Sequence, residues 1–296
     1  MTAWNNGDEL VLAVAANNSN TIVVINSVGP LILEPWIDHP NVTAVIWAGL
    51  GGTETGHALV DVLYGDVNPS GRLPYTIAKS PDDYPAQLET GGTTGEILNI
   101  TYTEGCVLSP LVRCRCAFAD AVVVSLFIDY RHFDAANITP RYEFGFGLSY
   151  TTFEYSDLSI SPVVGEQDQD SWFETNWAAG NPTPPAVGTS TALWLHRAFL
   201  SVSFTVENAG EYAGTEIPQV YVHFPDEADE PPSVLRGFTD VYLQPGEAVS
   251  VTITLSRFDL SIWDVDNQSW VLPPGTISLS VGASSRDFRL ESTVQF

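Results

Sequence analysis

The chain has 296 residues, of which 44% are hydrophobic and 11% aromatic, a composition typical of a folded protein with room for two domains. Its 36 acidic and 11 basic residues leave a net charge of −25, and Lys79 is its single lysine. So large a negative charge repels phosphate backbones and anionic lipid surfaces, which excludes nucleic-acid and membrane-surface binding. No run of about 18 apolar residues occurs, so no membrane-spanning helix is expected.

Residues 1–150 are expected to form an α/β domain. Two helices are predicted, because acidic residues stand at the start of each segment, where the helix dipole favours them, and apolar residues follow at helical spacing. Short β-branched apolar runs predict parallel strands covered on both faces, and their alternation with helices indicates an open sheet. The expected helices are 7–16 and 54–63, and the expected strands are 21–25, 43–47 and, after the turn Asn-Pro-Ser-Gly, 73–77.

Residues 151–296 are expected to form an all-β domain. Apolar residues at every second position, separated by Gly- and Pro-containing turns, indicate antiparallel strands packed as a two-layer sandwich. Within this region, residues 162–191 are rich in Pro, Gly and acids without a period, which predicts a surface loop or mobile insertion. The expected strands are 200–206, 219–224, 249–255 and 276–281.

Four sequence motifs carry a family resemblance. They are Trp-Ala-Gly-Leu-Gly-Gly-Thr-Glu-Thr-Gly at 47–56, Leu-Tyr-Gly-Asp-Val-Asn-Pro-Ser-Gly-Arg-Leu-Pro at 63–74, Phe-Ile-Asp-Tyr-Arg-His-Phe-Asp at 127–134 and Tyr-Glu-Phe-Gly-Phe-Gly-Leu-Ser-Tyr at 142–150. Together they resemble the C-terminal half of glycoside hydrolase family 3, most closely the fungal β-glucosidases. The resemblance implies an incomplete open α/β sandwich layer followed by an all-β fibronectin type III-like sandwich.

The resemblance also implies an activity for a longer parent protein. Such a parent is a secreted β-glucosidase that releases terminal non-reducing β-D-glucose from cellobiose and related glucosides by a retaining mechanism, with no cofactor and no metal. In the family the nucleophile is an Asp in a Ser-Asp-Trp-type motif of an N-terminal (β/α)8 barrel, and the acid/base Glu lies just before the stretch matched by residues 1–4. We therefore expect no catalytic, cofactor-binding or metal-binding residue here, and no activity without the barrel.

The start of the chain lacks the basic and apolar segments of a secretion signal. Five Asn-x-Ser/Thr sequons weakly favour secretion of the parent, whose leader would lie outside this chain. The sequons begin at Asn17, Asn41, Asn99, Asn137 and Asn267, and Pro140 after the fourth reduces its expected use.

Residues 106–125 interrupt the family pattern. They contain all three cysteines, and removing them joins Thr-Glu-Gly at 103–105 to Leu-Phe-Ile-Asp at 126–129, which restores the pattern. Two explanations stay open, namely translated intron sequence, which we favour, and a genuine insertion. Peptides or a transcript containing Cys114 and Cys116 would contradict the intron.

Several acids of the chain could in principle replace the absent nucleophile and acid/base, but each has a simpler structural explanation. Glu54 and Asp61 lie two helical turns apart, but Glu54 is more simply a helix-start acid, and Glu104 and Asp129 are more simply loop and turn acids. The glycine-rich stretch 49–56 has neither a Walker lysine nor the dinucleotide spacing, so it predicts a tight strand-to-helix turn.

The sequence contains no pattern typical of a metal site or of a serine hydrolase. The five histidines lack ligand spacing, Cys114 and Cys116 are too close for a zinc knuckle, and Gly-x-Ser-x-Gly is absent. The histidines are His39, His57, His132, His196 and His223.

The aromatic and charged motif at 130–134 has two interpretations. Its side chains could contact a sugar, or Tyr130 and Phe133 could pack while Arg131 and Asp134 form an ion pair, which we favour.

Three hypotheses remain for the chain itself. It is an inactive portion of a β-glucosidase, a non-catalytic carbohydrate- or protein-binding module, or a part that complements a separate barrel. The second predicts exposed coplanar rings among Trp194, Trp263 and Trp270, and the third predicts an apolar patch on the α/β layer.

Overall fold

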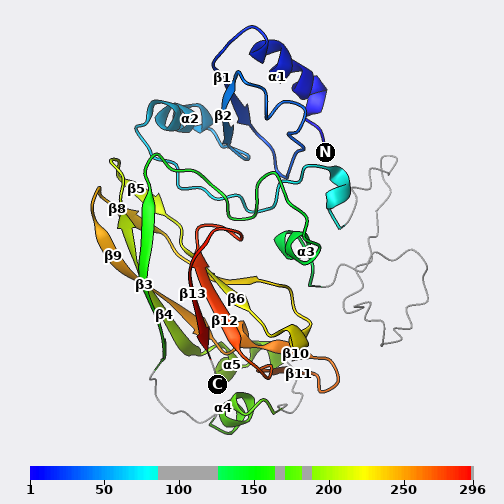
Figure 1. Ribbon diagram of the computed structural model, residues 1–296, viewed down its shortest axis with the longest axis vertical. Coiled ribbons are helices and arrows are strands. Elements are labelled where there is room, and N and C mark those ends of the chain that lie inside the picture. Colours follow the sequence, from blue (N-terminus) through cyan, green and yellow to red (C-terminus); the bar gives the residue numbers. More distant parts are fainter. Residues whose placement is uncertain (86–125, 164–170, 182–188, 295–296) are drawn as a thin grey trace, which may run out of the picture. The chain divides into compact units, whose positions relative to one another are not determined.

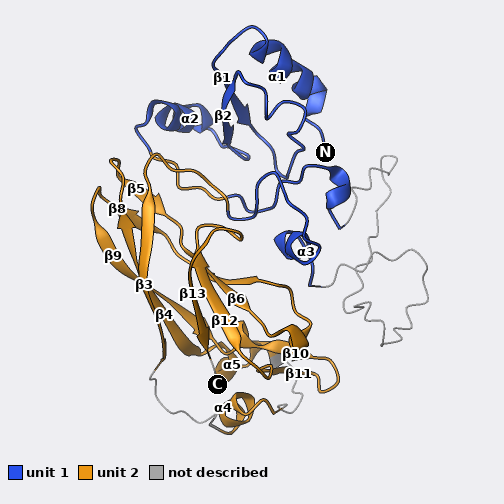
Figure 2. Ribbon diagram, viewed as in Figure 1, with its two compact units in different colours: residues 1–67, 73–145 blue, residues 68–72, 146–296 orange. Residues whose placement is uncertain are grey.

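The computed structural model describes residues 1–85, 126–163, 171–181 and 189–294, in two compact units (Figures 1 and 2). Unit 1 comprises residues 1–67 and 73–145, and unit 2 comprises residues 68–72 and 146–296. The expected fold class is confirmed, because an α/β region precedes an all-β sandwich. The proposed intron, residues 106–125, lies outside the described residues. None of the helices in the described part is long and apolar enough to cross a membrane.

Unit 1 is built around two parallel strands. Strands β1 and β2 pair in register from Ile22 opposite Ala44 to Ile25 opposite Trp47, so the two predicted strands are confirmed. Helix α1 has Asp8 and Glu9 in its first turn, where the helix dipole favours acids. The elements are η1 (Trp4–Asn6), α1 (Gly7–Ala15), β1 (Thr21–Ile25), β2 (Val42–Trp47), α2 (Thr55–Tyr64), η2 (Pro81–Asp83) and α3 (Tyr130–Ala135).

Two expectations for unit 1 are wrong. Residues 73–77 do not form a strand, because Ile77 makes only an isolated antiparallel bridge with Tyr142. The strands are not covered on both faces either, since the side chain of Ile22 on β1 is 43% exposed. A two-stranded sheet flanked by short helices has too few neighbours to bury both of its faces.

Unit 2 is an antiparallel sandwich. One sheet has the order β3-β4-β9 and the other β13-β12-β6-β7, with two additional strand pairs, β5-β8 and β10-β11. The four predicted strands are confirmed as β4, β6, β9 and β12. The strands are β3 (Phe153–Pro162), β4 (Ala198–Asn208), β5 (Gly214–Glu216), β6 (Gln219–His223), β7 (Val234–Phe238), β8 (Val241–Leu243), β9 (Ala248–Ser256), β10 (Ile262–Asp264), β11 (Ser269–Val271), β12 (Ile277–Gly282) and β13 (Phe288–Val294).

The core of unit 2 follows the period of two that the sequence shows. Alternate residues of β4, β9 and β12 are buried between the sheets, where they lose contact with water. They include Leu200, Val202, Phe204, Val206, Val251, Ile253, Leu255, Ile277, Leu279 and Val281.

The segment expected to be a surface loop, residues 162–191, contains structure. Helix α4 (Ser171–Ala178) inserts the fully buried Trp177 into the sandwich core, and its indole Nε1 donates to Ser261 Oγ at 2.7 Å. Glu174 of the same helix pairs with Arg257 at 3.2 Å. Phe173, one turn before Trp177, also packs on this core and stacks on Trp194, so two aromatic side chains attach a helix that is too short to give a clear apolar period. The remaining short helices are η3 (Thr189–Thr191), α5 (Leu193–His196), η4 (Asp226–Ala228) and η5 (Phe258–Leu260).

Candidate functional site

Residues 68–72 interrupt unit 1 in sequence but belong to unit 2 (Figure 2). The Asn68 side chain attaches this segment on two sides. Its Nδ2 donates to the carbonyl of Ala213 at 3.0 Å, and its Oδ1 accepts from Ser149 Oγ and the Tyr150 amide, both at 2.9 Å. A segment from the motif at 63–74 is therefore a structural part of the sandwich unit.

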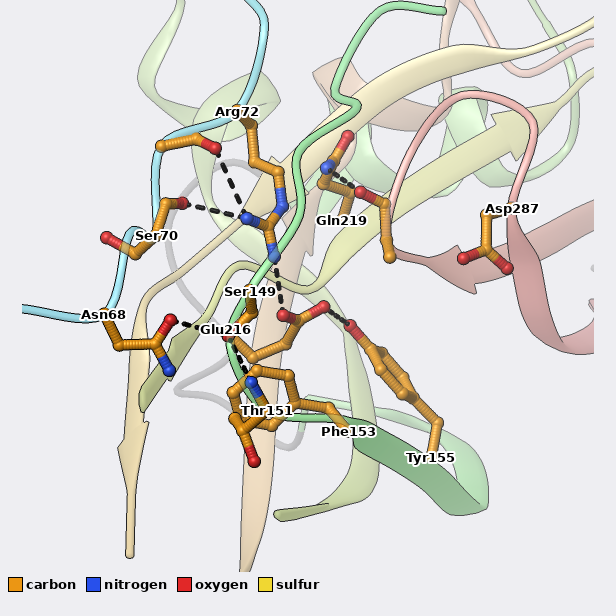
Figure 3. A network of polar contacts seen from close by, with 12 residues as sticks. Asn68, Ser70, Arg72, Ser149, Thr151, Phe153, Tyr155, Glu216, Gln219 and Asp287 are labelled. Carbon is orange, nitrogen blue, oxygen red and sulfur yellow. Dashed lines mark hydrogen bonds and ion pairs between the residues drawn. The ribbon is translucent and has the colours of Figure 1, made fainter. Parts of the chain in front are cut away.

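A buried ion pair holds the other end of the segment (Figure 3). Arg72 Nη2 lies 2.6 Å from Glu216 Oε2, and the two side chains are only 9% and 2% exposed. Arg72 Nη1 also donates to the carbonyl of Ser70 at 3.1 Å. Because charges removed from water are stable only when paired, each residue of the pair depends on the other.

Tyr155 completes what we call the Arg72 network, namely Asn68, Arg72, Tyr155 and Glu216. The Tyr155 hydroxyl donates to Glu216 Oε1 at 2.8 Å, and the guanidinium of Arg289 lies 4.9 Å from the Tyr155 ring centroid. Burial raises the pKa of Tyr155 well above its usual range, and the neighbouring Glu216 carboxylate raises it further. Tyr155 therefore remains a protonated donor in neutral and acidic solution.

The Arg72 network is suited to holding the chain and unsuited to hydrolysis. Retaining glycoside hydrolysis requires two carboxyl groups about 5 to 5.5 Å apart that both reach the sugar. Glu216 has both oxygens hydrogen-bonded to protein groups and is almost completely buried. A glucoside therefore cannot reach it. The sequence offered no local signal for this network, since Arg72 and Glu216 are 144 residues apart and Glu216 lies in none of the four motifs.

The acids considered as replacements for the catalytic carboxylates lie in the following positions of the structure. Glu54 is the residue before α2 and pairs with His57 on an exposed surface, as a helix-start acid does. Asp129 accepts from the Thr76 amide at 2.8 Å and from Thr76 Oγ1 at 3.2 Å, with its own backbone at φ 54°. Asp61 lies within α2, whereas Glu104 lies outside the described residues.

The glycine-rich stretch is a tight turn between β2 and α2. A Cβ atom on Gly51 would lie 1.9 Å from Thr55 Oγ1, and Thr55 Oγ1 donates to the carbonyl of Gly52 at 2.5 Å. The close approach of Thr55 at Gly51 and the φ of 62° at Gly49 explain these two glycines without a phosphate.

The motif at 130–134 forms α3 and packs through its aromatic side chains. Phe133 is fully buried, Tyr130 is nearly so, and the Tyr130 ring stacks on Phe144 with centroids 4.7 Å apart. The guanidinium of Arg131 lies 5.8 Å from the Tyr130 ring centroid. The packing interpretation is supported, and the ion pair between Arg131 and Asp134 stays a prediction.

The histidines are dispersed in the described structure and bind neighbouring protein groups. His132 Nε2 lies 3.1 Å from the carbonyl of Asp83, and the two nitrogens of His223 lie 2.7 Å and 2.8 Å from Pro232 O and Ser280 Oγ. Among the described residues, no three His, Cys, Asp or Glu side chains gather as a metal site would require. Cys114 and Cys116 lie outside this part of the chain.

The three tryptophans do not form a carbohydrate platform. Trp194 is buried and stacks on Phe173. Trp263 is partly exposed, but its ring stands at 65° to that of Trp270 rather than coplanar with it. The arrangement expected of a polysaccharide-binding module is therefore not formed by these residues.

Unit 1 instead exposes apolar helix faces. Leu10 and Val14 are one turn apart on α1, and Val60, Leu63 and Tyr64 share a face of α2. All are exposed, with Tyr64 at 81%, and α2 has no buried residue. Exposed apolar faces of this kind are typical of surfaces that contact another protein segment.

Comparisons with known proteins agree with these features. Residues 1–150 match the glycosyl hydrolase family 3 C-terminal domain, and residues 216–285 match a fibronectin type III-like domain. The chain is 46% identical over 291 residues to a probable beta-glucosidase L of Neosartorya fischeri, covering 98% of this chain and 34% of that protein. It is 44% identical over 294 residues to beta-glucosidase cel3A of Pyricularia oryzae, covering 98% of this chain and 35% of that protein.

A solved structure has a similar fold. The beta-D-glucoside glucohydrolase from Trichoderma reesei superimposes with a TM-score of 0.80 at 44% identity, covering 99% of this chain and 36% of that one. The chain thus spans about a third of the length of the relatives it matches. Motifs, fold and similarity together show that the chain belongs to glycosyl hydrolase family 3, of which it contains the C-terminal domain followed by the fibronectin type III-like domain.

Proposed function

We propose that the chain is the C-terminal portion of a retaining β-glucosidase that removes terminal non-reducing β-D-glucosyl residues from cellobiose and related glucosides. The observation that carries this proposal is 44–46% identity to β-glucosidases over 98% of the chain, which corresponds to about a third of their length. The nucleophile, the acid/base and the barrel are supplied by the remaining two thirds. The acidic composition and the sequons favour a secreted parent.

The exposed apolar faces of α1 and α2 support the same proposal. A face carrying Leu10 and Val14 and another carrying Val60, Leu63 and Tyr64 are unfavourable in water at about 25 cal/mol per Å² of apolar surface. We propose that the missing part of the enzyme covers both faces. The chain then supports the catalytic barrel structurally and is inactive by itself.

A complementation assay tests this function. The purified chain is assayed on nitrophenyl β-D-glucoside, alone and after mixing with the part of the Trichoderma reesei enzyme that this chain does not match. We expect turnover at the level of the buffer blank for the chain alone and turnover above the blank for the mixture. Turnover by the chain alone would show that catalytic groups lie within it and would contradict the proposal.

Charged substitutions on the apolar faces identify the contact. Leu10→Asp and Tyr64→Asp place a charge where the missing part is proposed to pack, so each should lower the turnover of the mixture at least tenfold. Ser250→Asp, at an exposed position of β9, is the matched control and should leave it unchanged. Equal turnover in all three mixtures would contradict docking on α1 and α2.

A further inference from the structure

The sequon at Asn267 occupies the tip of the β10–β11 hairpin (Figure 1). Asn267 is exposed, and its Nδ2 donates to Asp264 Oδ2 at 2.7 Å. The amides of Asp266 and Asn267 both donate to Asp264 Oδ1 at 3.0 Å, which forms the turn. The side chain of Asn267 therefore projects from a compact turn where an attached group would meet solvent.

The third residue of this sequon, Ser269, has the opposite environment. Its side chain is fully buried at the start of β11, opposite Asp264, and its Oγ has no hydrogen-bond partner among the described residues. A buried hydroxyl without a partner destabilises the folded state, because it loses its hydrogen bonds to water and gains none. Alanine would occupy the same place without this cost, so the hydroxyl of Ser269 has no visible role in the folded hairpin.

We propose that Asn267 is an acceptor of an N-linked oligosaccharide and that the sugar is attached before the hairpin folds. The Ser269 hydroxyl is required at that stage, when the enzyme that transfers the sugar recognises the extended Asn-x-Ser segment. Its burial afterwards is the cost of keeping the recognition residue. This proposal depends on passage through a secretory compartment and not on glucosidase activity.

The transfer balances with a lipid-linked oligosaccharide diphosphate as donor. The Asn267 Nδ2 loses one hydrogen and forms a bond to C1 of the first sugar, while the C1–oxygen bond to the lipid diphosphate breaks and the diphosphate leaves with the electron pair. A base of the transferring enzyme accepts the proton. The second Nδ2 hydrogen remains available for Asp264 Oδ2, so the turn can close on the glycosylated chain.

Two other sequons provide internal comparisons. Asn17 and Ser19 are both exposed after α1, so this site is accessible before and after folding. Asn41 is half-buried, its Nδ2 donates to the carbonyl of Ala15 at 2.7 Å, and its carbonyl accepts from the Thr21 amide at 2.8 Å. A sugar attached to Asn41 before folding would obstruct the packing of this side chain at the end of α1, so we expect chains modified at Asn41 to fold poorly and to be rare in the secreted protein.

Site occupancy tests the proposal directly. The chain is produced with an added secretion leader in yeast, and its glycopeptides are measured by mass spectrometry after enzymatic removal of the sugar in ¹⁸O water. We expect the ¹⁸O label at Asn267 and Asn17 in most molecules and at Asn41 in few. An unmodified Asn267 in the secreted protein would overturn the proposal.

The order of modification and folding has its own test. Folded protein from bacteria and the isolated peptide 260–275 are each incubated with a purified oligosaccharyltransferase and its lipid-linked donor. We expect the peptide to be modified at Asn267 and the folded protein to be modified at Asn17 but not at Asn267. Modification of Asn267 at the same rate in folded protein and peptide would overturn the proposed order.

Variants of Ser269 separate recognition from packing. Ser269→Ala should abolish occupancy of Asn267, whereas Ser269→Thr, which preserves the sequon, should retain it. Unglycosylated Ser269→Ala should have a melting temperature equal to or above that of the parent chain, because the unpartnered hydroxyl is removed. A lower melting temperature would show that the hydroxyl serves the fold and would contradict the proposal.

Discussion

The two units differ in how completely they bury their apolar residues. In unit 2, a continuous cluster connects the two sheets, α4 and α5. In unit 1, the buried clusters are small: one contains Ile25, Leu33, Trp36 and Ile77, and the other contains Ile32, Ala78 and Phe133. The sandwich thus has one continuous core, whereas the α/β unit has small clusters and two helices with exposed apolar residues.

The units also use charge differently. In unit 2, Arg72 and Glu216 are paired in the interior. In unit 1, Arg141 pairs with Glu34 at 2.6 Å and with Asp38 at 3.0 Å, and these side chains remain partly exposed. A buried pair contributes strongly when one partner is removed, whereas exposed pairs contribute little. Removing one partner of an ion pair should therefore lower the free energy of unfolding more in unit 2 than in unit 1.

The largest effect is expected from Arg72→Met. It leaves the buried Glu216 carboxylate without its cation and should lower the free energy of unfolding of unit 2 by about 3–5 kcal/mol, measured by urea denaturation. The double variant Arg72→Met with Glu216→Leu removes both charges and should recover much of the loss. A single variant within about 1 kcal/mol of the parent would show that the pair contributes little.

The next largest effect on the free energy of unfolding is expected from truncation of a core side chain, and it should differ between the two units. Leu255→Ala in the fully buried sandwich core should cost about 2–5 kcal/mol, because it removes apolar contacts and leaves a cavity. Leu33→Ala in unit 1 should fall at the low end of this range, since its smaller cluster can relax. Ser250→Ala on the exposed face of β9 is the control. Equal losses in Leu255→Ala and Leu33→Ala would remove the proposed contrast between the cores.

Alkaline titration compares a buried tyrosine of each unit, and its effect on stability should lie between those of core truncation and of surface substitution. Burial raises the pKa of Tyr84 in unit 1 to about 12, above its unfolded value of about 10. Its contribution to stability is therefore present below pH 10 and is lost as the pH rises through 10 to 12. Burial raises the pKa of Tyr155 in unit 2 further. Tyrosinate absorbance of Tyr84→Phe and Tyr155→Phe should show that Tyr84 ionises first, and the reverse order would contradict these environments.

The smallest effect on stability is expected from the exposed apolar faces of unit 1. Leu10→Ser and Tyr64→Ser should change the free energy of unfolding by no more than about 0.5 kcal/mol, because both side chains already contact water. They should nevertheless reduce self-association, measured by light scattering. A large loss of stability would mean that these residues are packed within the isolated chain.

The sequence predicted individual strands better than it predicted the contacts that hold distant segments together. Residues 21–25 and 43–47 were correctly predicted as parallel strands, and alternation located four strands of the sandwich, because both patterns repeat over a few neighbouring residues. The strand predicted at 73–77 is wrong because β-branched and aromatic composition does not supply a pairing partner. Helix α4 was missed because only Trp177 and Phe173 attach it to the core, which is too short a pattern to show a helical period.

The absence of a catalytic pair was expected from the resemblance and stays a prediction for the chain as a whole. For the described acids the structure adds positions: Glu54 starts a helix, Asp129 binds Thr76, and Glu216 is enclosed by Arg72 and Tyr155. Glu54 was expected at a helix start, whereas the partners of Asp129 and Glu216 could not be read from the sequence, since they are distant in the chain.

The sequence by itself determined the family, the two fold classes and six of the thirteen strands of the described residues, because motifs and hydrophobic periods are local properties. Only the tertiary structure decided that residues 68–72 belong to the sandwich unit and that Arg72 meets Glu216, 144 residues away. It likewise decided which sequon asparagine is exposed and which recognition serine is buried. Ion pairs and burial depend on chain segments brought together by folding, and no local pattern records them.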